Sequence, residues 1–132
     1  MGLLFLQLQN YSDRINRVDP TQIEQSMIFH VLHYIEENYR EGSLEELAEQ
    51  LSQPAYYLSK LIKKQSGSTF KQLLQTRRLN QAAFLLTTTM LPVEDIIALV
   101  GYDNTSYFHR IFKAQYHMTP KAYRLQADRN DA

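Results

Sequence analysis

Two sets of side chains with matching spacing could bind a polar, negatively charged ligand. Each set combines short hydrogen-bonding side chains with Lys or Arg, and the second follows the first at an offset of 50 residues. The sets are Ala55, Tyr56, Ser59, Lys60 and Lys63, and Thr105, Ser106, His109, Arg110 and Lys113. Residues at such intervals share one face of a helix. Arg and Lys can reach the acceptors of guanine, and Ser and Thr can contact bases or phosphates, so both faces suit DNA.

No catalytic or metal-binding pattern accompanies these faces. The chain has no Cys, which excludes disulfides and thiolate ligands. No Ser-His-Asp arrangement, glycine-rich phosphate loop or pair of catalytic carboxylates stands out. His30 and His33 have a spacing that can chelate a metal, but no nearby Asp, Cys or third His completes a site. We therefore expect no enzyme activity, no cofactor and no metal.

Charge is unevenly distributed along the chain. The formal net charge of the 132 residues is zero, which argues against nonspecific binding to polyanions. Residues 43–126 nevertheless hold ten basic and six acidic side chains, whereas residues 1–42 hold three and six. The apolar run at residues 3–6 is far shorter than the roughly 20 residues of a membrane span, and it lacks the basic start and the small-residue cleavage site of a signal peptide. These features predict a soluble, cytoplasmic protein without a membrane partner.

Apolar residues recur at helical spacing almost throughout, which predicts an all-α fold. One helix is expected from Met1 to about Val18 and another from about Pro20 to Tyr39, with Gly42 as its C-terminal cap. Ser43 and Glu46 form a capping-box pattern at the start of a short helix. The remaining expected helices cover about 54–66, 69–87 and a short stretch from Pro92.

The apolar pattern also repeats. Leu44, Leu47 and Leu51 match Val93, Ile96 and Val100 at an offset of 49, and after one extra turn residue the offset becomes 50. There Leu58, Leu61, Ile62 and Lys63 match Phe108, Ile111, Phe112 and Lys113. Two copies of a short helix, a tight turn and a longer helix are typical of paired helix-turn-helix units. One polar helix face could arise by chance, but two faces in the same register favour DNA binding.

The chain resembles the AraC/XylS family of bacterial transcription regulators over about residues 28–124. The resemblance lies in Leu44–Ala48, Tyr57–Lys64, Arg78–Ala82, Gly101–Phe108, Phe112–Lys113 and Met118–Arg124. It implies a seven-helix tandem helix-turn-helix domain at 21–126, with units at about 43–66 and 92–116 and a linking helix at about 69–87. An extra N-terminal linker helix would occupy residues 1–20, and residues 127–132 would form a tail.

The resemblance also implies which residues contact DNA. Two recognition helices would read successive major-groove segments whose centres lie about 34 Å apart. Base contacts would fall on Tyr56, Ser59, Lys60, Thr105, Ser106, His109 and Arg110. Backbone contacts would fall on Gln53, Lys63, Arg77, Asn104 and Lys113.

Three residues depart from the family pattern. Ser52 and His117 stand where Gly is common, and a side chain with a β-carbon is strained at positive φ. Ile97 stands where a small Ala usually packs, which predicts wider packing in the second unit and a less well positioned recognition helix. None of the three removes an expected DNA contact.

Family members usually carry an effector-binding or dimerisation domain before this module, and only about 25 residues precede it here. We therefore expect the chain to be the C-terminal part of a larger regulator, the alternative being a naturally short one. The expected partners are double-stranded DNA and RNA polymerase. The competing interpretation is a protein-interaction module on a helix-turn-helix scaffold, whose binding would change little with salt.

Overall fold

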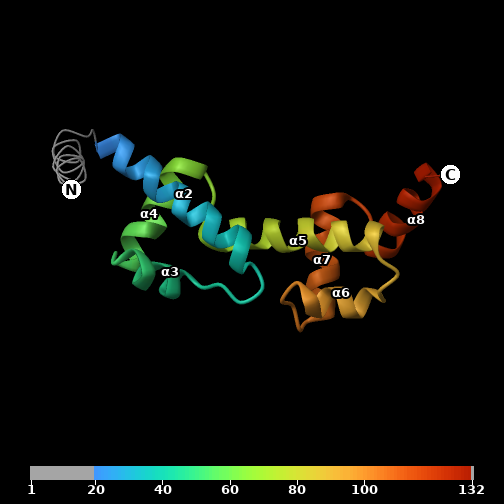
Figure 1. Cartoon of the computed structure of the whole chain (residues 1–132). Helices are drawn as coiled ribbons and strands as arrows, with labels where there is room; N and C mark the ends of the chain where they lie inside the picture. The colour runs from blue at the N-terminus through green and yellow to red at the C-terminus, as the bar shows by residue number, and fades with distance from the viewer. Residues whose placement is uncertain (1–19, 132) are drawn as a thin grey trace, which may run out of the picture.

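The computed structural model describes residues 20–131 and confirms the all-α prediction (Figure 1). This range contains seven helices and no strand: α2 (Pro20–Asn38), α3 (Leu44–Leu51), α4 (Ala55–Ser66), α5 (Phe70–Thr88), α6 (Val93–Leu99), α7 (Thr105–Tyr116) and α8 (Pro120–Asp131). The helix expected at residues 1–18 lies outside the described residues. No helix in the described range is long and apolar enough to span a bilayer.

Helix α5 connects two groups of helices, with α2, α3 and α4 around its N-terminal half and α6, α7 and α8 around its C-terminal half (Figure 1). We call these groups, each with its half of α5, the first and the second unit. Each unit has its own core. The first contains Val31, Tyr34, Ile35, Leu47, Ala48, Leu58, Ile62, Phe70 and Leu74. The second contains Leu79, Ala82, Ala83, Leu86, Ile96, Ile97, Val100, Phe108 and Phe112.

The start of α3 differs in part from the expected capping box. The Ser43 hydroxyl accepts the Glu46 N–H at 3.1 Å, as expected. The Ser43 N–H, however, donates to the Tyr34 hydroxyl at 2.9 Å rather than to the Glu46 carboxylate. Burial raises the pKa of Tyr34, so this hydroxyl stays neutral. A complete capping box occurs instead at the start of α5, between Thr69 and Gln72.

The end of α2 also differs from expectation. The helix ends at Asn38, and the Gly42 N–H donates to the Asn38 carbonyl at 2.7 Å without a positive φ at Gly42. A β-carbon at Gly42 would lie 2.5 Å from that carbonyl oxygen and 3.0 Å from the Tyr34 ring. Gly42 is therefore needed for a close approach and not as a left-handed cap.

Other boundaries differ from expectation by a few residues. Pro54 and Pro92 precede the first helical residue of α4 and α6 as extended N-caps. The sequence predicts a tail at 127–132, whereas α8 continues to Asp131. No Gly or Pro stands between residues 121 and 131 to end that helix.

Ser52 and His117 adopt the left-handed backbone that their place in the family pattern implies. Their φ angles are 54° and 63°, and each follows the last residue of a helix. Gly67 has the same place after α4, with φ of 78°. The second unit therefore carries at His117 a strain that the first unit avoids at Gly67.

Replacing His117 with glycine is expected to raise the free energy of unfolding by about 0.5–1 kcal/mol. Glycine relieves left-handed strain of about 1–2 kcal/mol and loses roughly 0.5–1 kcal/mol through its more flexible unfolded state. Urea denaturation of His117→Gly measures this effect. Ala114→Gly, at an exposed site within α7, is the control and should destabilise the protein by about 0.5–1 kcal/mol. Equal losses in both variants would contradict the assignment of strain to His117.

Candidate nucleic-acid interface

Helix α4 has one buried and one exposed face. Leu58, Leu61 and Ile62 are buried, because their spacing of three and four residues directs them to the same side. On the other side of the helix, Ser59, Lys60 and Lys63 are exposed, and Tyr56 is 70% exposed. The four expected contact residues of this helix therefore lie on its solvent side.

Helix α7 repeats this arrangement. Phe108 and Phe112 are fully buried and hold the inner face against the second core. The positions expected for DNA contacts are all exposed: Thr105, Ser106, His109, Arg110 and Lys113. The Arg110 guanidinium lies over the Tyr107 ring at 5.2 Å from its centroid, and both residues line a shallow cleft with Asn104 and Ser106.

The N-terminal turn of α7 orients two of the candidate residues. The Asn104 side-chain oxygen accepts the Tyr107 N–H at 2.9 Å and caps the helix, which leaves its amide NH₂ as a donor. The His109 Nδ1 lies 2.7 Å from the Thr105 carbonyl oxygen. Because a carbonyl only accepts, Nδ1 carries the proton, and Nε2 of a neutral His109 is an acceptor.

Polar contacts fix α7 against the linking helix α5. The Tyr107 hydroxyl donates to Gln75 Oε1 at 3.0 Å, and Asn80 Oδ1 accepts bonds from Tyr116 at 2.6 Å and Gln115 at 3.1 Å. Burial raises the pKa of Tyr116, which keeps this hydroxyl protonated as a donor. The sequence alone does not predict these contacts, since nothing in the local pattern indicates which polar residues meet between distant helices.

Positive charge is unevenly distributed over the helices of this formally neutral chain. Helices α4 and α7 contain no acidic residue, whereas α4 carries Lys60, Lys63 and Lys64 and α7 carries Arg110 and Lys113. Within the two helix-turn-helix pairs, α3–α4 and α6–α7, the acidic residues of the helices lie on the shorter helix, with three on α3 and two on α6. Positive charge is thus concentrated on the two exposed faces.

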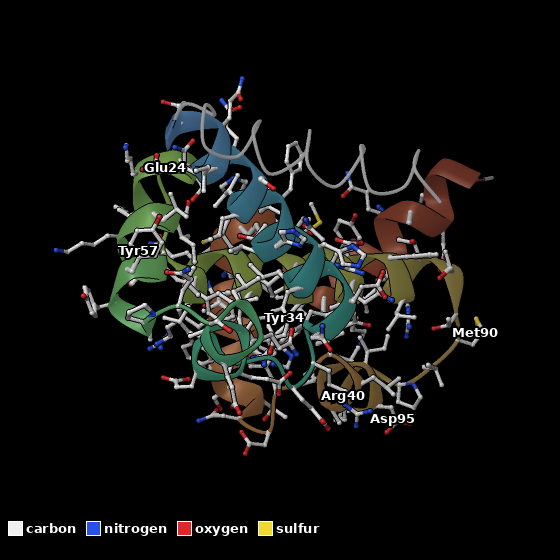
Figure 2. All side chains as sticks on the ribbon, turned by 60° about the vertical axis from the view of Figure 1, so that its left-hand side comes forward. Glu24, Tyr34, Arg40, Tyr57, Met90 and Asp95 are labelled. Carbon is white, nitrogen blue, oxygen red and sulfur yellow. The ribbon has the colours of Figure 1, made fainter. Side chains whose placement is uncertain are left out.

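The expected backbone-contacting residues occupy different environments. Gln53 is half-buried in the turn before α4, and Lys113 is exposed on α7. The Lys63 ammonium donates to the Gly67 carbonyl at 3.0 Å, within its own helix end. Its neighbour Lys64 pairs with Glu24 of α2 at 3.0 Å, which Figure 2 shows beside α4.

Arg77 lies apart from the other expected backbone-contacting residues. Its Nε lies 2.9 Å from Glu36 Oε2 of α2, an ion pair without hydrogen-bond geometry, and its guanidinium lies 4.4 Å from the centroid of the Tyr39 ring. Its Nη1 donates to Gln81 at 3.1 Å. In this structure the Arg77 side chain therefore contacts α2 and its own helix, and not the faces of α4 and α7.

Comparison with known proteins identifies the fold and the family. A family model described as a helix-turn-helix domain matches residues 47–126, which include helices α4 and α7. The chain belongs to this family, in its AraC/XylS branch. The resemblance that the sequence motifs indicated is thus confirmed, and so is the tandem helix-turn-helix architecture.

Several AraC-type and related proteins are similar to the chain. The C-terminal domain of AraT, a response regulator from Geobacillus stearothermophilus, is 34% identical with a TM-score of 0.70, covering 83% of this chain and 88% of that one. A DNA-binding transcriptional dual regulator from Escherichia coli K-12 is 26% identical with a TM-score of 0.71, covering 78% and 93%. The regulatory protein PocR of Salmonella typhimurium is 34% identical over 100 residues, which are 75% of this chain and 33% of PocR.

Membership of the AraC-type family makes the chain a DNA-binding module of transcription regulation. The family consists of transcriptional regulators and not of enzymes. Among the described residues, no group of three or more His, Cys, Asp or Glu side chains is arranged to hold a metal ion. The chain spans a third or less of the length of the first curated relatives that it matches.

Proposed function

We propose that the chain reads a two-part operator, with α4 in one major-groove segment and α7 in the next. The observation that carries this proposal is the pair of exposed faces at an offset of 50 residues, each backed by its own buried core. A recognition helix needs such a polar outer face, because its inner face must pack on the preceding helix. A single protein-interaction surface would not need two equivalent faces free of acidic residues.

On α4, Lys60 would donate to the O6 and N7 acceptors of a guanine. The Ser59 side chain is short, and its hydroxyl would contact either a donor or an acceptor on a base edge. The largely exposed ring of Tyr56 would contact a thymine methyl group. These three residues are the proposed base contacts of the first unit.

On α7, Arg110 would form a bidentate pair with guanine, because its planar guanidinium matches the two acceptors. The Nε2 acceptor of neutral His109 suits an amino group such as cytosine N4. Thr105 and Ser106, in the first turn of the helix, would complete the base contacts of the second unit.

The backbone contacts would come from residues beside these faces. Gln53 and Asn104 precede α4 and α7, and the Asn104 amide has a donor to offer a phosphate oxygen. Lys63 and Lys113 would neutralise phosphates nearer the ends of the helices. Arg77 would add a phosphate contact only by leaving Glu36.

The other proposed partners belong to a full-length regulator that is longer than this chain. Because the chain spans only 33% of PocR, we propose that an effector-binding or dimerisation domain precedes it in the full-length regulator. We also propose that the regulator acts in the cytoplasm, where it would bind double-stranded DNA and contact RNA polymerase.

Selection of duplexes from a random library at physiological salt tests the proposed reading mode. We expect two short boxes whose centres lie about one helical turn apart. A salt titration on the selected duplex should give a steep linear fall in log K against log salt, with a slope of about −0.9 for each phosphate contacted. A single box would reject the joint action of α4 and α7. Absence of any salt-sensitive binding would reject DNA and favour a protein-interaction module.

A further inference from the structure

The two units meet at a small junction beside the middle of α5. Within residues 20–131, each pair of helices with extensive contact belongs to a single unit, and α5 is shared by both units. Tyr39, just after the end of α2, is the residue whose ring packs against both cores. We call Tyr39, Arg40, Arg78, Gly101 and Tyr102 the junction. These residues come from the turn that follows the first unit's α2, from α5 and from the α6–α7 turn of the second unit.

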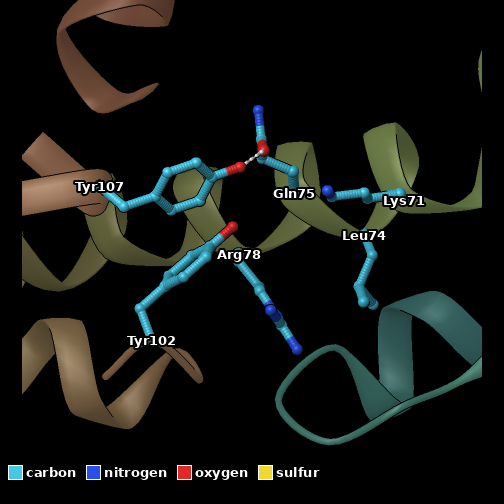
Figure 3. Close-up of a pocket in the computed structure, with 6 residues that line it drawn as sticks. All are labelled: Lys71, Leu74, Gln75, Arg78, Tyr102 and Tyr107. Carbon is cyan, nitrogen blue, oxygen red and sulfur yellow. Dashed lines mark hydrogen bonds between the residues drawn. The ribbon is translucent and has the colours of Figure 1, made fainter. Parts of the chain in front are cut away.

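Arg78 connects all three segments. Its Nε donates to the Tyr39 carbonyl at 2.6 Å, and its Nη2 donates to the Arg40 carbonyl at 3.0 Å. Its guanidinium lies 5.1 Å from the centroid of the Tyr102 ring, and Figure 3 shows both side chains at one cleft. Hydrogen bonds from a charged donor are stronger than neutral ones, and a cation suits the carbonyls at a helix C-terminus.

Gly101 brings the backbones of the two units together. A β-carbon there would lie 2.6 Å from the Arg40 carbonyl oxygen and 3.2 Å from Arg78 Nε. Its φ of 102° is also one that side-chain-bearing residues rarely adopt. The α6–α7 turn can therefore rest on the end of α2 only with glycine at this position.

We propose that the junction sets the relative placement of α4 and α7, and thereby the spacing between the two DNA boxes that the protein binds best. This inference rests on the proposed two-box reading. Helix α5 alone would leave the units free to bend and twist about a single connection. The junction adds a second attachment away from the helix axis, which fixes their orientation. Arg78 acts here as a positioning residue, because its donors are directed to Tyr39 and Arg40.

The first test measures binding to selected operators whose boxes are moved apart or together by one and two base pairs. Wild-type protein should lose about tenfold or more in affinity on the shifted operators, since losing even one bidentate base contact has an effect of that order. Arg78→Ala should bind the original operator more weakly and lose less than about threefold on shifting. Arg78→Lys should fall between them, because lysine keeps a charged donor but not the planar fork.

Arg124→Ala is the matched control. Arg124 donates to the Leu86 carbonyl at 2.9 Å and to the Leu91 carbonyl at 2.7 Å, but both partners lie within the second unit. Its loss should reduce stability by the same mechanism and leave the spacing preference as sharp as in the wild type. A wild-type spacing preference in Arg78→Ala, or a broadened one in Arg124→Ala, would overturn the inference. An unchanged salt slope in Arg78→Ala separates positioning from phosphate binding.

A second test needs no DNA. Because the chain has no Cys, Glu49→Cys and Ala114→Cys provide two unique sites for spin labels, at exposed positions of α3 and α7. The distance distribution should be narrow in the wild-type background and in Arg124→Ala, and broad in Arg78→Ala and Gly101→Ala. An equally narrow distribution in both junction variants would reject the junction even if DNA binding is normal. If instead the wild type selects no box while the junction variants broaden the distribution, the proposed reading fails and the junction remains.

Discussion

Replacing Phe108 with alanine is expected to lower the free energy of unfolding by about 3–5 kcal/mol. The Phe108 side chain is 0% exposed, and its ring centroid lies 5.7 Å from those of both Tyr102 and Phe112. Removal of the ring leaves a cavity between α6 and α7 that these neighbours can fill only in part. Urea denaturation of the isolated chain, followed by far-ultraviolet circular dichroism, measures the change.

Phe84→Ala is the control for this substitution. Phe84 also lies on a helix, α5, but its side chain is 49% exposed, so its loss should change stability by less than about 1 kcal/mol. Similar losses in the two variants would contradict the position of Phe108 at the centre of the second core. Two separate unfolding steps in Phe108→Ala would show that the first unit keeps its structure after the second has unfolded.

Arg110→Ala is expected to cost about 1–3 kcal/mol of binding free energy on the selected operator and to relax the preference at one base position. The physical reason is the loss of a bidentate contact with guanine, which no other exposed side chain of α7 can replace with the same geometry. Fluorescence anisotropy on the operator, on single-base variants and on a scrambled duplex measures both effects. Equal losses on the operator and the scrambled duplex would remove Arg110 from the base-reading set.

Lys113→Ala separates base reading from phosphate binding on the same helix. Lys113 lies one turn after Arg110 on α7 and is exposed. Its loss should weaken all duplexes to a similar extent and reduce the salt slope by about one. The two variants therefore differ in sequence dependence and not only in the size of the loss.

The residues of the two candidate faces could be predicted because exposure follows directly from helix periodicity. Once the apolar side of each helix, with Leu58 or Phe108, is assigned to a core, the opposite side must be exposed, and the structure shows it so. Their contact with DNA remains a prediction from the chemistry of the side chains. The all-α fold could be predicted for the same reason, since it depends on a pattern within each segment.

The two neighbouring arginines of α5 show where such reasoning ends. Adjacent residues of a helix point in different directions, so Arg77 and Arg78 meet different partners. Which of them faces Glu36 and which faces the carbonyls of Tyr39 and Arg40 depends on how α2 crosses α5. That crossing is a tertiary property. Ser43 gives a similar lesson, because its N–H is bound by a tyrosine nine residues earlier and not by the local capping partner.

The sharing of α5 by both cores limits how such a domain can be divided or recombined. Phe70 and Leu74 complete the first core, and the second begins at Leu79 on the same helix. A fragment ending in the loop before α6 would keep the first core whole. The complementary fragment, with α6, α7 and α8, would lack the α5 residues of its own core. A chimaera that exchanges one reading unit between two regulators would have to be joined between residues 75 and 78. Its designer would also have to match Arg78 to the end of α2 from one parent and to the glycine turn from the other.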